Sequence, residues 1–246
     1  MDLLVGTLTL RPYVFAFLAA FLVAAALDLG WRRTLGFGGC VWSVAWLSEF
    51  SSTRTGVPFG HYQYTGLTRG RELYIADVPF VDALSFTFLA YAAFCLARVA
   101  LAGRDPSAWT LALGAGVLMM ALDVVIDPLA VRGDRWFLGR IFTYTTPVIY
   151  FGVPLSNFVG WIVVGTLGVG LYLFLVPGGF GRRVWPGVAL YYGVLGFNLA
   201  VTLWIDEWLM AGVGATLHVA IAVVIWRIQR AMMTQGIPLN RGVRRA

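Results

Sequence analysis

The chain has 246 residues, of which 59% are hydrophobic and only 12% are charged. A soluble domain carries about 25% charged residues, so this composition excludes an ordinary soluble protein and is typical of a chain that lies in lipid. The formal charge is +6, but the basic residues are all Arg and lie scattered over loops and the tail, without the aromatic-rich basic stripe of a nucleic-acid-binding surface.

Seven apolar stretches are candidates for crossing a membrane, which takes about 20 residues. In chain order they are 12–29, 35–50, 79–101, 109–126, 157–176, 184–205 and 207–227. We therefore predict an all-α fold, a polytopic membrane helix bundle of about seven transmembrane helices. Residues 1–228 form this single transmembrane bundle in the prediction, and residues 229–246 form a basic, disordered C-terminal tail.

Two long loops interrupt the predicted helices. Residues 51–78 are polar and rich in turn-forming residues, whereas residues 128–156 are half apolar. Within the second loop, residues 141–151 are too short to span a membrane. We predict that they form an interfacial or re-entrant segment between the fourth and fifth helices.

The distribution of Arg predicts the orientation of the bundle. Arg residues are more numerous in the loops and tail on the C-terminal side of the membrane than on the opposite side. Positive residues concentrate on the cytoplasmic side of membrane proteins. We therefore expect a multi-pass protein of the plasma membrane with a cytoplasmic C-terminus and an external N-terminus.

Half of the acidic residues fall at ends of predicted helices, namely Glu49, Asp82, Asp123, Asp127, Asp206 and Glu207. With seven spans, all six lie at one membrane face, from which both long loops also leave. An ionised Asp at the bilayer centre costs about 2.5–3.5 kcal/mol, and acids in spans usually line a cavity or pathway. Glu49 and Asp123 lie about a turn inside their helices, which favours a functional role. Asp82, Asp206 and Glu207 are either functional or simply interfacial.

Asp123 and Asp127 form the sharpest local motif. Their i, i+4 spacing places both carboxyl groups on one face of a helix. Two close carboxylates resist double ionisation, and the helix C-terminus adds negative potential, so the pair is expected to share a proton. Pro128 is expected to end the helix at Asp127. This arrangement predicts a carboxylic acid that can donate a proton at neutral pH.

Aromatic and polar side chains surround the acids in the sequence. They are either members of the interfacial aromatic belt and partners of nearby polar groups, or the lining of an apolar slot whose ring faces stabilise a cation. As candidate substrate-binding residues we take Arg54, Tyr62, Tyr64, Asp82, Trp136, Tyr150, Phe151, Asn157, Trp161, Asn198 and Asp206. Tyr144 lies among the same aromatics.

Several kinds of chemistry are excluded by residues that the sequence lacks. His61 and His218 are the only histidines, too few for the His-rich di-iron site of a membrane oxygenase. Without any Lys, a retinal Schiff base cannot form. Cys40 and Cys95 make neither a disulfide framework nor a metal site. What remains is acid–base chemistry by carboxyl groups or a divalent ion held by them. Of these we predict acid–base chemistry, with no metal and no cofactor.

Three segments carry a family resemblance: 49–65 (EFSSTRTGVPFGHYQYT), 123–136 (DVVIDPLAVRGDRW) and 150–161 (YFGVPLSNFVGW). Together they resemble the CruF-type carotenoid hydratases of the membrane carotenoid-biosynthesis family. The resemblance covers residues from about 49 to 161. It implies hydration of the terminal 1,2 double bond of an acyclic ψ-end carotenoid, such as γ-carotene or bisanhydrobacterioruberin, to a tertiary alcohol without a cofactor. It assigns no catalytic residue.

The residues themselves suggest a mechanism for such a reaction. The carotenoid end enters laterally from lipid into a slot beneath the two loops. Asp123 or Asp127 protonates C2, a tertiary cation forms at C1 among aromatic faces, and water oriented by Glu49 or the other Asp captures it. The expected partners are the isoprenoid lipid substrate, water, membrane lipid and other carotenoid-pathway enzymes.

Two other hypotheses about the function remain open from the sequence. The first is a membrane polyprenyl transferase or carotenoid elongase, in which Asp-rich motifs hold a Mg-diphosphate. A diphosphate site also needs clustered basic groups and usually a second Asp-rich motif, for which Asp206 and Glu207 are a poor substitute. The second is a non-catalytic membrane protein that binds a carotenoid or another isoprenoid lipid.

Overall fold

The computed structural model describes residues 3–176, 180–181 and 183–234, and these residues form a helix bundle. Its helices are α1 (Leu3–Leu10), α2 (Pro12–Leu29), α3 (Trp31–Thr55), α4 (Phe80–Ala100), α5 (Ala108–Ala130), α6 (Leu155–Leu175), α7 (Trp185–Trp204) and α8 (Trp208–Thr234). Each of the seven predicted stretches corresponds to one of α2 to α8, and α1 was not predicted. The all-α polytopic bundle is therefore confirmed.

Six of the described helices are long and apolar enough to cross a membrane: α2, α4, α5, α6, α7 and α8. Helix α3 runs alongside them but does not meet the same hydropathy requirement, because its 25 residues include Arg32, Arg33, Glu49 and Arg54. The chain is thus an integral, multi-pass membrane protein. Helix α8 continues to Thr234, past the predicted bundle boundary at residue 228, and residues 235–246 of the predicted tail lie outside the described residues.

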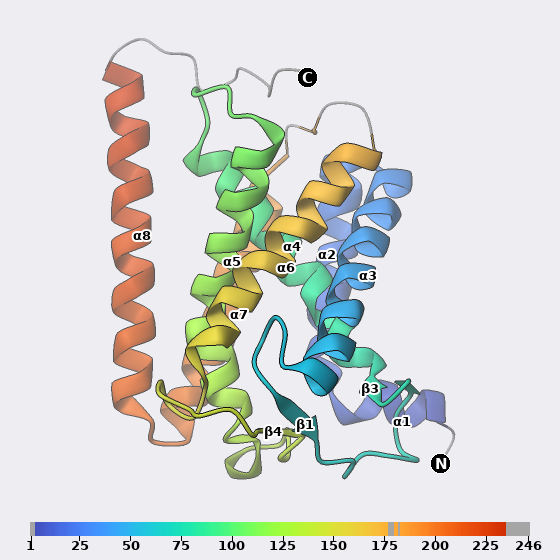
Figure 1. The fold of residues 1–246 in the computed structure, drawn as a ribbon. Helices are drawn as coiled ribbons and strands as arrows, with labels where there is room; N and C mark the ends of the chain where they lie inside the picture. Colours follow the sequence, from blue (N-terminus) through green and yellow to red (C-terminus); the bar gives the residue numbers. More distant parts are fainter. Residues whose placement is uncertain (1–2, 177–179, 182, 235–246) are drawn as a thin grey trace.

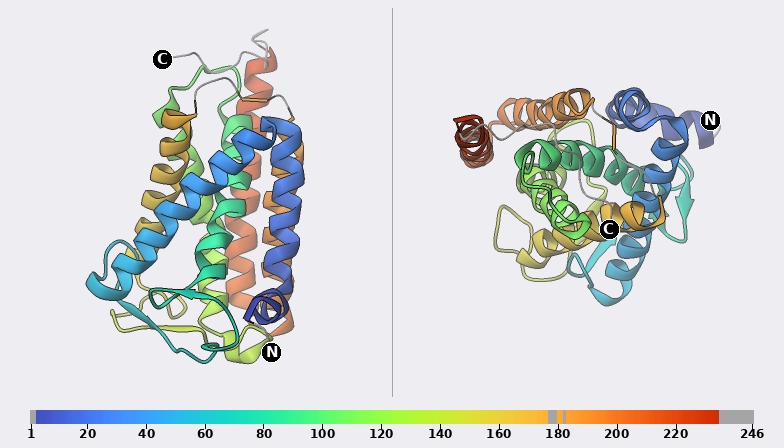
Figure 2. Two further views of the ribbon diagram at one scale, coloured as in Figure 1. Left: turned by 90° about the vertical axis from the view of Figure 1, so that its right-hand side faces the viewer. Right: turned by 90° about the horizontal axis from the view of Figure 1, so that it is seen from above.

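Helix α4 occupies the centre of the bundle, and most of its residues are buried. It contacts α2, α3, α5 and α7, while α8 lies at the periphery against α5 and α7 (Figure 2). Local signals start the surrounding helices: Pro12 begins α2, and the Ser107 side chain accepts a hydrogen bond from the Thr110 backbone N–H at 3.1 Å at the start of α5.

Both long loops lie at the same end of the bundle as α1 (Figure 1). Gly56, with a left-handed φ of 79°, ends α3 and turns the chain into the first loop. That loop contains β1 (Tyr62–Tyr64), β2 (Tyr74–Ile75) and β3 (Val78–Pro79), and the second contains the short helix η1 (Gly133–Arg135) and β4 (Phe142–Tyr144). β1 pairs antiparallel with β4, with Tyr62 opposite Tyr144, and β2 pairs with β3. The segment between α5 and α6 is therefore extended and packs across this end of the bundle.

Pro128 does not end α5 as predicted, because the helix continues to Ala130. A proline has no N–H to donate to the carbonyl four residues earlier, which is that of Val124. The Tyr150 hydroxyl donates to this Val124 oxygen at 3.3 Å instead. Asp127 accordingly lies within the last turn of the helix and not at its terminus.

Helices α5 and α6 approach closely through two glycines, as small residues allow in membrane bundles. A Cβ atom at Gly116 would lie 2.5 Å from the Ile162 carbonyl oxygen, and one at Gly165 would lie 2.8 Å from Gly116 Cα. Neither backbone atom can move without shifting a helix. The contact therefore sets the spacing between the two helices that carry Asp127 and Asn157.

We expect Gly116→Ala to destabilise the protein by about 1–3 kcal/mol, because the added methyl group overpacks this contact. Gly193→Ala on α7 is the matched control, since a Cβ atom there meets nothing within 4 Å. Thermal denaturation in detergent measures both variants. Equal melting temperatures for the two would contradict the close packing of α5 on α6.

Candidate active site

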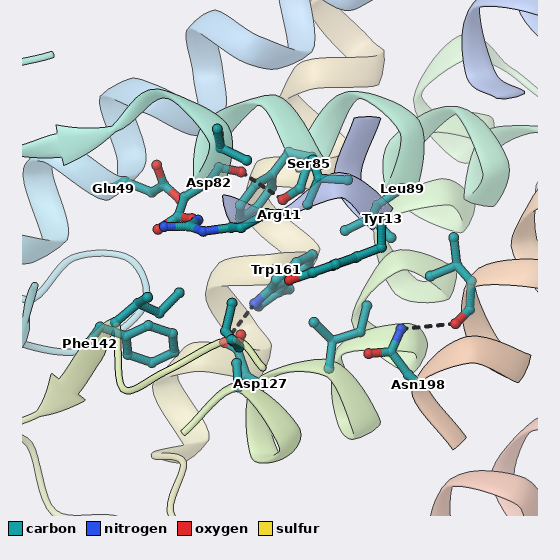
Figure 3. A pocket seen from close by; sticks show the side chains of 18 of the residues that line it. Arg11, Tyr13, Glu49, Asp82, Ser85, Leu89, Asp127, Phe142, Trp161 and Asn198 are labelled. Atoms are coloured by element: carbon teal, nitrogen blue, oxygen red, sulfur yellow. Dashed lines mark hydrogen bonds and ion pairs between the residues drawn. The ribbon is translucent and has the colours of Figure 1, made fainter. Parts of the chain in front are cut away.

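A cavity opens among the helices at the loop end of the bundle, with an empty volume of about 950 Å³ that is partly open to the outside. The side chains that line it come from α2 to α7 and from β1, β4 and the segment between η1 and β4 (Figure 3). Of the residues predicted from the sequence, the cavity brings together Glu49, Tyr62, Tyr64, Asp82, Asp127, Trp136, Asn157, Trp161 and Asn198. The cavity thus brings three of the six predicted acids, which lie on helices, together with aromatic residues of both long loops.

Asp127 is the most heavily hydrogen-bonded acid in the cavity. Its Oδ2 atom accepts hydrogen bonds from Asn157 Nδ2 at 2.7 Å, Tyr144 Oη at 3.2 Å and Trp161 Nε1 at 3.3 Å. Burial, followed by the charge of Asp127, raises the pKa of Tyr144 well above its ordinary value, so the phenol keeps the proton that it donates. Three donors from β4 and α6 thus hold this carboxyl group in one position.

Asp123 lies behind Asp127 and is fully buried, without lining the cavity itself. The Asn157 Nδ2 atom that binds Asp127 also donates to Asp123 Oδ2 at 2.7 Å, so one amide joins the two carboxyl groups. Among the described residues, Asp123 Oδ1 has no hydrogen-bond partner, and neither acid forms an ion pair. Asp123 is therefore buried and Asp127 half-buried, and neither has a neutralising cation.

Arg11, which entered the sequence analysis only as a topological charge, lies in the opposite wall of the cavity. Its side chain is 4% exposed and forms ion pairs with Glu72, at 2.6 Å, and with Asp82. Figure 3 shows Arg11 and Asp82 beside Glu49, with Asp127 on the other side of the cavity. A single Arg inside the apolar run LTLRPYVF was the signal available in the sequence, because a basic residue there needs an acidic partner.

Glu49 lies near the end of α3, buried, and lines the cavity near Asp82. In the described part of the chain, its Oε2 atom has no hydrogen-bond partner. Tyr62 and Tyr64 of β1 cover it from the loop side. Burial, followed by the Glu49 carboxyl group, raises the pKa of both phenols well above the ordinary value, so they remain protonated donors.

Aromatic rings form the apolar walls of the cavity. Trp161 stacks on Phe86 with ring centroids 4.4 Å apart, and Phe59 packs at a tilt against both. Other lining residues were missed from the sequence, among them Tyr13, Phe86 and Phe197 of the spans and Phe142 of β4. An apolar residue in a span carries no signal that separates a cavity wall from a lipid-facing or core position.

The cavity does not include four of the predicted binding residues. Arg54 is 40% exposed and pairs with Asp77 on the loop surface, and Tyr150 bonds the Val124 carbonyl. Phe151 packs against Tyr150, and its carbonyl oxygen accepts from Arg132 Nη1 at 2.6 Å. Asp206 is exposed at the turn between α7 and α8. The side chains of these four residues therefore do not line the cavity.

Glu207 joins this turn to the second loop. Its carboxylate binds Arg132 Nε at 2.9 Å and also pairs with Arg135. Although burial acts in the opposite direction, the hydrogen bonds and charges of these two Arg lower the pKa of Glu207. The stability that this depressed pKa contributes is complete above the ordinary pKa of Glu and is lost as the pH falls through the folded value.

We expect Glu207→Gln to lower stability by up to about 1 kcal/mol at neutral pH, because the pairs are partly solvent-exposed. The difference from the wild type should shrink in acidic buffer, where the wild-type carboxylate is protonated. Thermal denaturation at neutral and acidic pH measures this. A difference that persists unchanged at low pH would mean that the charge of Glu207 is not what stabilises the turn.

Comparison with known proteins identifies the family. The family model described as carotenoid biosynthesis protein matches residues 10–221. A similar relative is the bisanhydrobacterioruberin hydratase of Haloarcula japonica, which is 32% identical over 179 residues covering 69% of this chain and 57% of the relative. The chain thus spans little more than half the length of this curated relative, and no solved structure matches it. With most of its length matched by the family model, the chain belongs to the carotenoid biosynthesis protein family.

Proposed function

We propose that this protein is a carotenoid hydratase, which adds water across the terminal 1,2 double bond of an acyclic ψ-end carotenoid and forms a tertiary alcohol. The observation that carries the proposal is a pair of linked carboxyl groups without a neutralising cation, one buried and one facing a cavity walled by aromatic rings. The hydratase name of the relative from Haloarcula japonica supports the same reaction class.

Asp127 is the proton donor in this proposal. It lines the cavity, whereas Asp123 touches it only through Asn157. Two neighbouring carboxyl groups joined by one amide, one of them buried, favour holding a shared proton, since double ionisation of such a pair is costly. Asp127 donates this proton to C2 of the double bond, and Asp123 acts as a positioning residue that keeps the proton available.

The tertiary cation then forms at C1, and two features of the site stabilise it. The stacked rings of Phe86 and Trp161 offer π faces to a positive charge. The ion cluster of Arg11 with Glu72 and Asp82 contains one guanidinium and two carboxylates, so it retains net negative charge. This net negative charge stabilises the cation, because the attraction by the two carboxylates exceeds the repulsion by the Arg11 guanidinium.

Water captures the cation from the side of the first loop. The Glu49 side chain, which lines the cavity, is a suitable acceptor for one hydrogen of that water. As the oxygen bonds to C1, the water releases one proton to the carboxylates and thus replaces the proton donated by Asp127. The net reaction adds H at C2 and OH at C1, and no electrons are exchanged with a cofactor.

Isotope labelling tests the reaction. Membranes that contain the protein are incubated with an acyclic carotenoid in heavy-oxygen water, and the pigments are analysed by mass spectrometry. We expect a mass gain of one water with the label in the new hydroxyl group, also when oxygen is excluded. A label that comes only from heavy dioxygen would instead establish an oxygenase, and an unchanged carotenoid would support a non-catalytic carrier.

The Mg-diphosphate alternative is less well supported by the cavity. Arg11 is the one basic residue among the described residues that line it, and Glu72 and Asp82 already occupy its guanidinium. A diphosphate needs several available positive groups. We therefore expect hydration to persist in the presence of a metal chelator, and abolition by the chelator would favour the transferase.

We also propose that the protein lies in the plasma membrane with its C-terminus in the cytoplasm. The described end of α8 and the two long loops lie at opposite ends of the bundle (Figure 1), so the cavity then opens toward the external face. Its substrate would pass through membrane lipid from other carotenoid-pathway enzymes. Reporter fusions to the C-terminus and to the 51–78 loop test this orientation.

A further inference from the structure

The cavity is too short to hold a whole carotenoid. On α4 it extends from Val81 to Leu89, a rise of roughly 12 Å at 1.5 Å per residue. An extended carotenoid is about as long as the hydrocarbon core is thick, which is about 30 Å. If the reacting end lies beside Asp127, most of the polyene must therefore leave the cavity through its wall into the lipid.

The wall between α2 and α7 has the composition of such an opening. Tyr13 and Phe17 of α2 and Phe197 of α7 line the cavity and are all partly exposed. Tyr13 stacks on Phe197 with centroids 5.1 Å apart, and Phe17 contacts Phe197 edge-on at 5.6 Å. Figure 3 shows Tyr13 near Leu89, on the side of the cavity away from Glu49. We call these three residues the aromatic seam.

The seam continues both inward and outward through further rings. Inward, Phe17 contacts Phe88 of α4 at 5.6 Å. Outward, Tyr13 contacts Phe137 at 5.7 Å, and Phe137 contacts Trp204 at 6.4 Å. Phe137 is 52% and Trp204 is 65% exposed. A continuous series of ring contacts thus leads from the cavity interior to the exposed surface near the loop end of the bundle.

We propose that the aromatic seam is a lateral portal that binds the conjugated tail of the substrate while its end group lies at Asp127. This inference rests on the proposed hydration and assigns the tail-binding site that the hydration needs. A conjugated polyene is flat and rigid, and it presents π faces that stack on aromatic rings better than a saturated chain does. The seam consequently selects long, conjugated substrates, and each molecule reacts at one end at a time.

A comparison of two substrates tests the portal in the full-length protein. Hydration is measured with a long ψ-end carotenoid and with a short acyclic isoprenoid that has the same end group but no conjugated tail. We expect Phe197→Leu to lower the ratio of kcat/KM for the long over the short substrate by about tenfold, mainly through KM. Phe174→Leu is the matched control, because Phe174 is 83% exposed on α6, away from the cavity.

A second measurement follows substrate binding and does not depend on catalysis. It therefore still tests the portal where a variant has too little stability to be assayed for hydration. Binding of the long carotenoid to the Asp127→Asn protein is followed by its absorbance after gel filtration, with and without Phe197→Leu. We expect the seam variant to retain about tenfold less carotenoid at a limiting concentration. A third test introduces Tyr13→Cys and Phe197→Cys into a chain in which Cys40 and Cys95 are replaced. A cross-link between the two new thiols should block hydration of the long substrate, and removal of the cross-link should restore it.

The outcomes separate the portal from the hydratase. If the wild type hydrates neither substrate but carotenoid binding still depends on Phe197, the proposed function fails and the portal stands. If hydration occurs, but both the substrate ratio and carotenoid binding are unchanged in Phe197→Leu and the cross-link has no effect, the portal is overturned and the proposed function stands.

Discussion

Asp127→Asn is expected to lower the rate of hydration by about 10²–10⁴-fold, the usual contribution of a positioned general acid. Asparagine has nearly the shape of aspartic acid and keeps an oxygen that accepts from Asn157, Tyr144 and Trp161. It has no acidic proton to give to the double bond. The variant should therefore fold and bind carotenoid normally while forming almost no tertiary alcohol, as measured by pigment analysis.

Asp123→Asn is expected to abolish hydration as well, but for a different reason. Asp123 does not line the cavity, so its loss acts through the proton shared with Asp127. The pH profile of any residual activity should therefore differ from that of the wild type. Asp134→Asn is the matched control, because this acid is exposed and pairs with Arg140 on the loop surface. Full activity in both Asp123→Asn and Asp127→Asn would disprove the assignment of the proton donor.

Arg11→Met is expected to cost about 3–5 kcal/mol of stability, the largest structural effect that we predict. The substitution keeps an unbranched side chain but leaves Glu72 and Asp82 buried without their cation. Burial already raises the pKa of Glu72, and Arg11 opposes this shift. Without Arg11 the folded-state pKa rises further, so the defect should be smaller in acidic buffer and grow as the pH rises. Thermal denaturation across pH measures both effects.

Two further variants identify the cause of this loss. Arg11→Lys keeps the charge but cannot bind two carboxylates with a planar fork, so it should recover only part of the stability. The triple variant Arg11→Met, Glu72→Gln, Asp82→Asn removes the unpaired charges and should recover most of it. A wild-type melting temperature for Arg11→Met alone would show that water reaches the cluster and that no buried ion pair is broken.

The sequence predicted the helices and the acid layer because both depend on local properties. Long apolar runs have few alternatives in a membrane, where each backbone polar group must be bonded internally. Once the number of helices is known, their alternating directions place all helix ends at one of two faces. Glu49, Asp82 and Asp127 could therefore be brought to a common site without knowledge of any packing. The i, i+4 spacing of Asp123 and Asp127 likewise predicted that they would share a helix face.

Packing decided the roles of individual residues within that layer. The sequence could not show that Asp127 lines the cavity while Asp123 lies behind it, because this depends on the position of α6 and Asn157. The sequence analysis also placed Tyr150 among the binding residues. In the structure, the Tyr150 hydroxyl instead donates a hydrogen bond to the Val124 carbonyl, to which Pro128 cannot donate.

The amino-acid sequence alone determined that this protein is a membrane helix bundle with half of its acids and both long loops at one face, since hydropathy and helix direction are carried by neighbouring residues. Only the tertiary structure decided that Arg11 pairs with Glu72 and Asp82, and that Tyr13, Phe17 and Phe197 form a seam beside the cavity. The partners in these contacts come from different parts of the chain. Such pairings are set by how the helices pack, and no local sequence pattern encodes them.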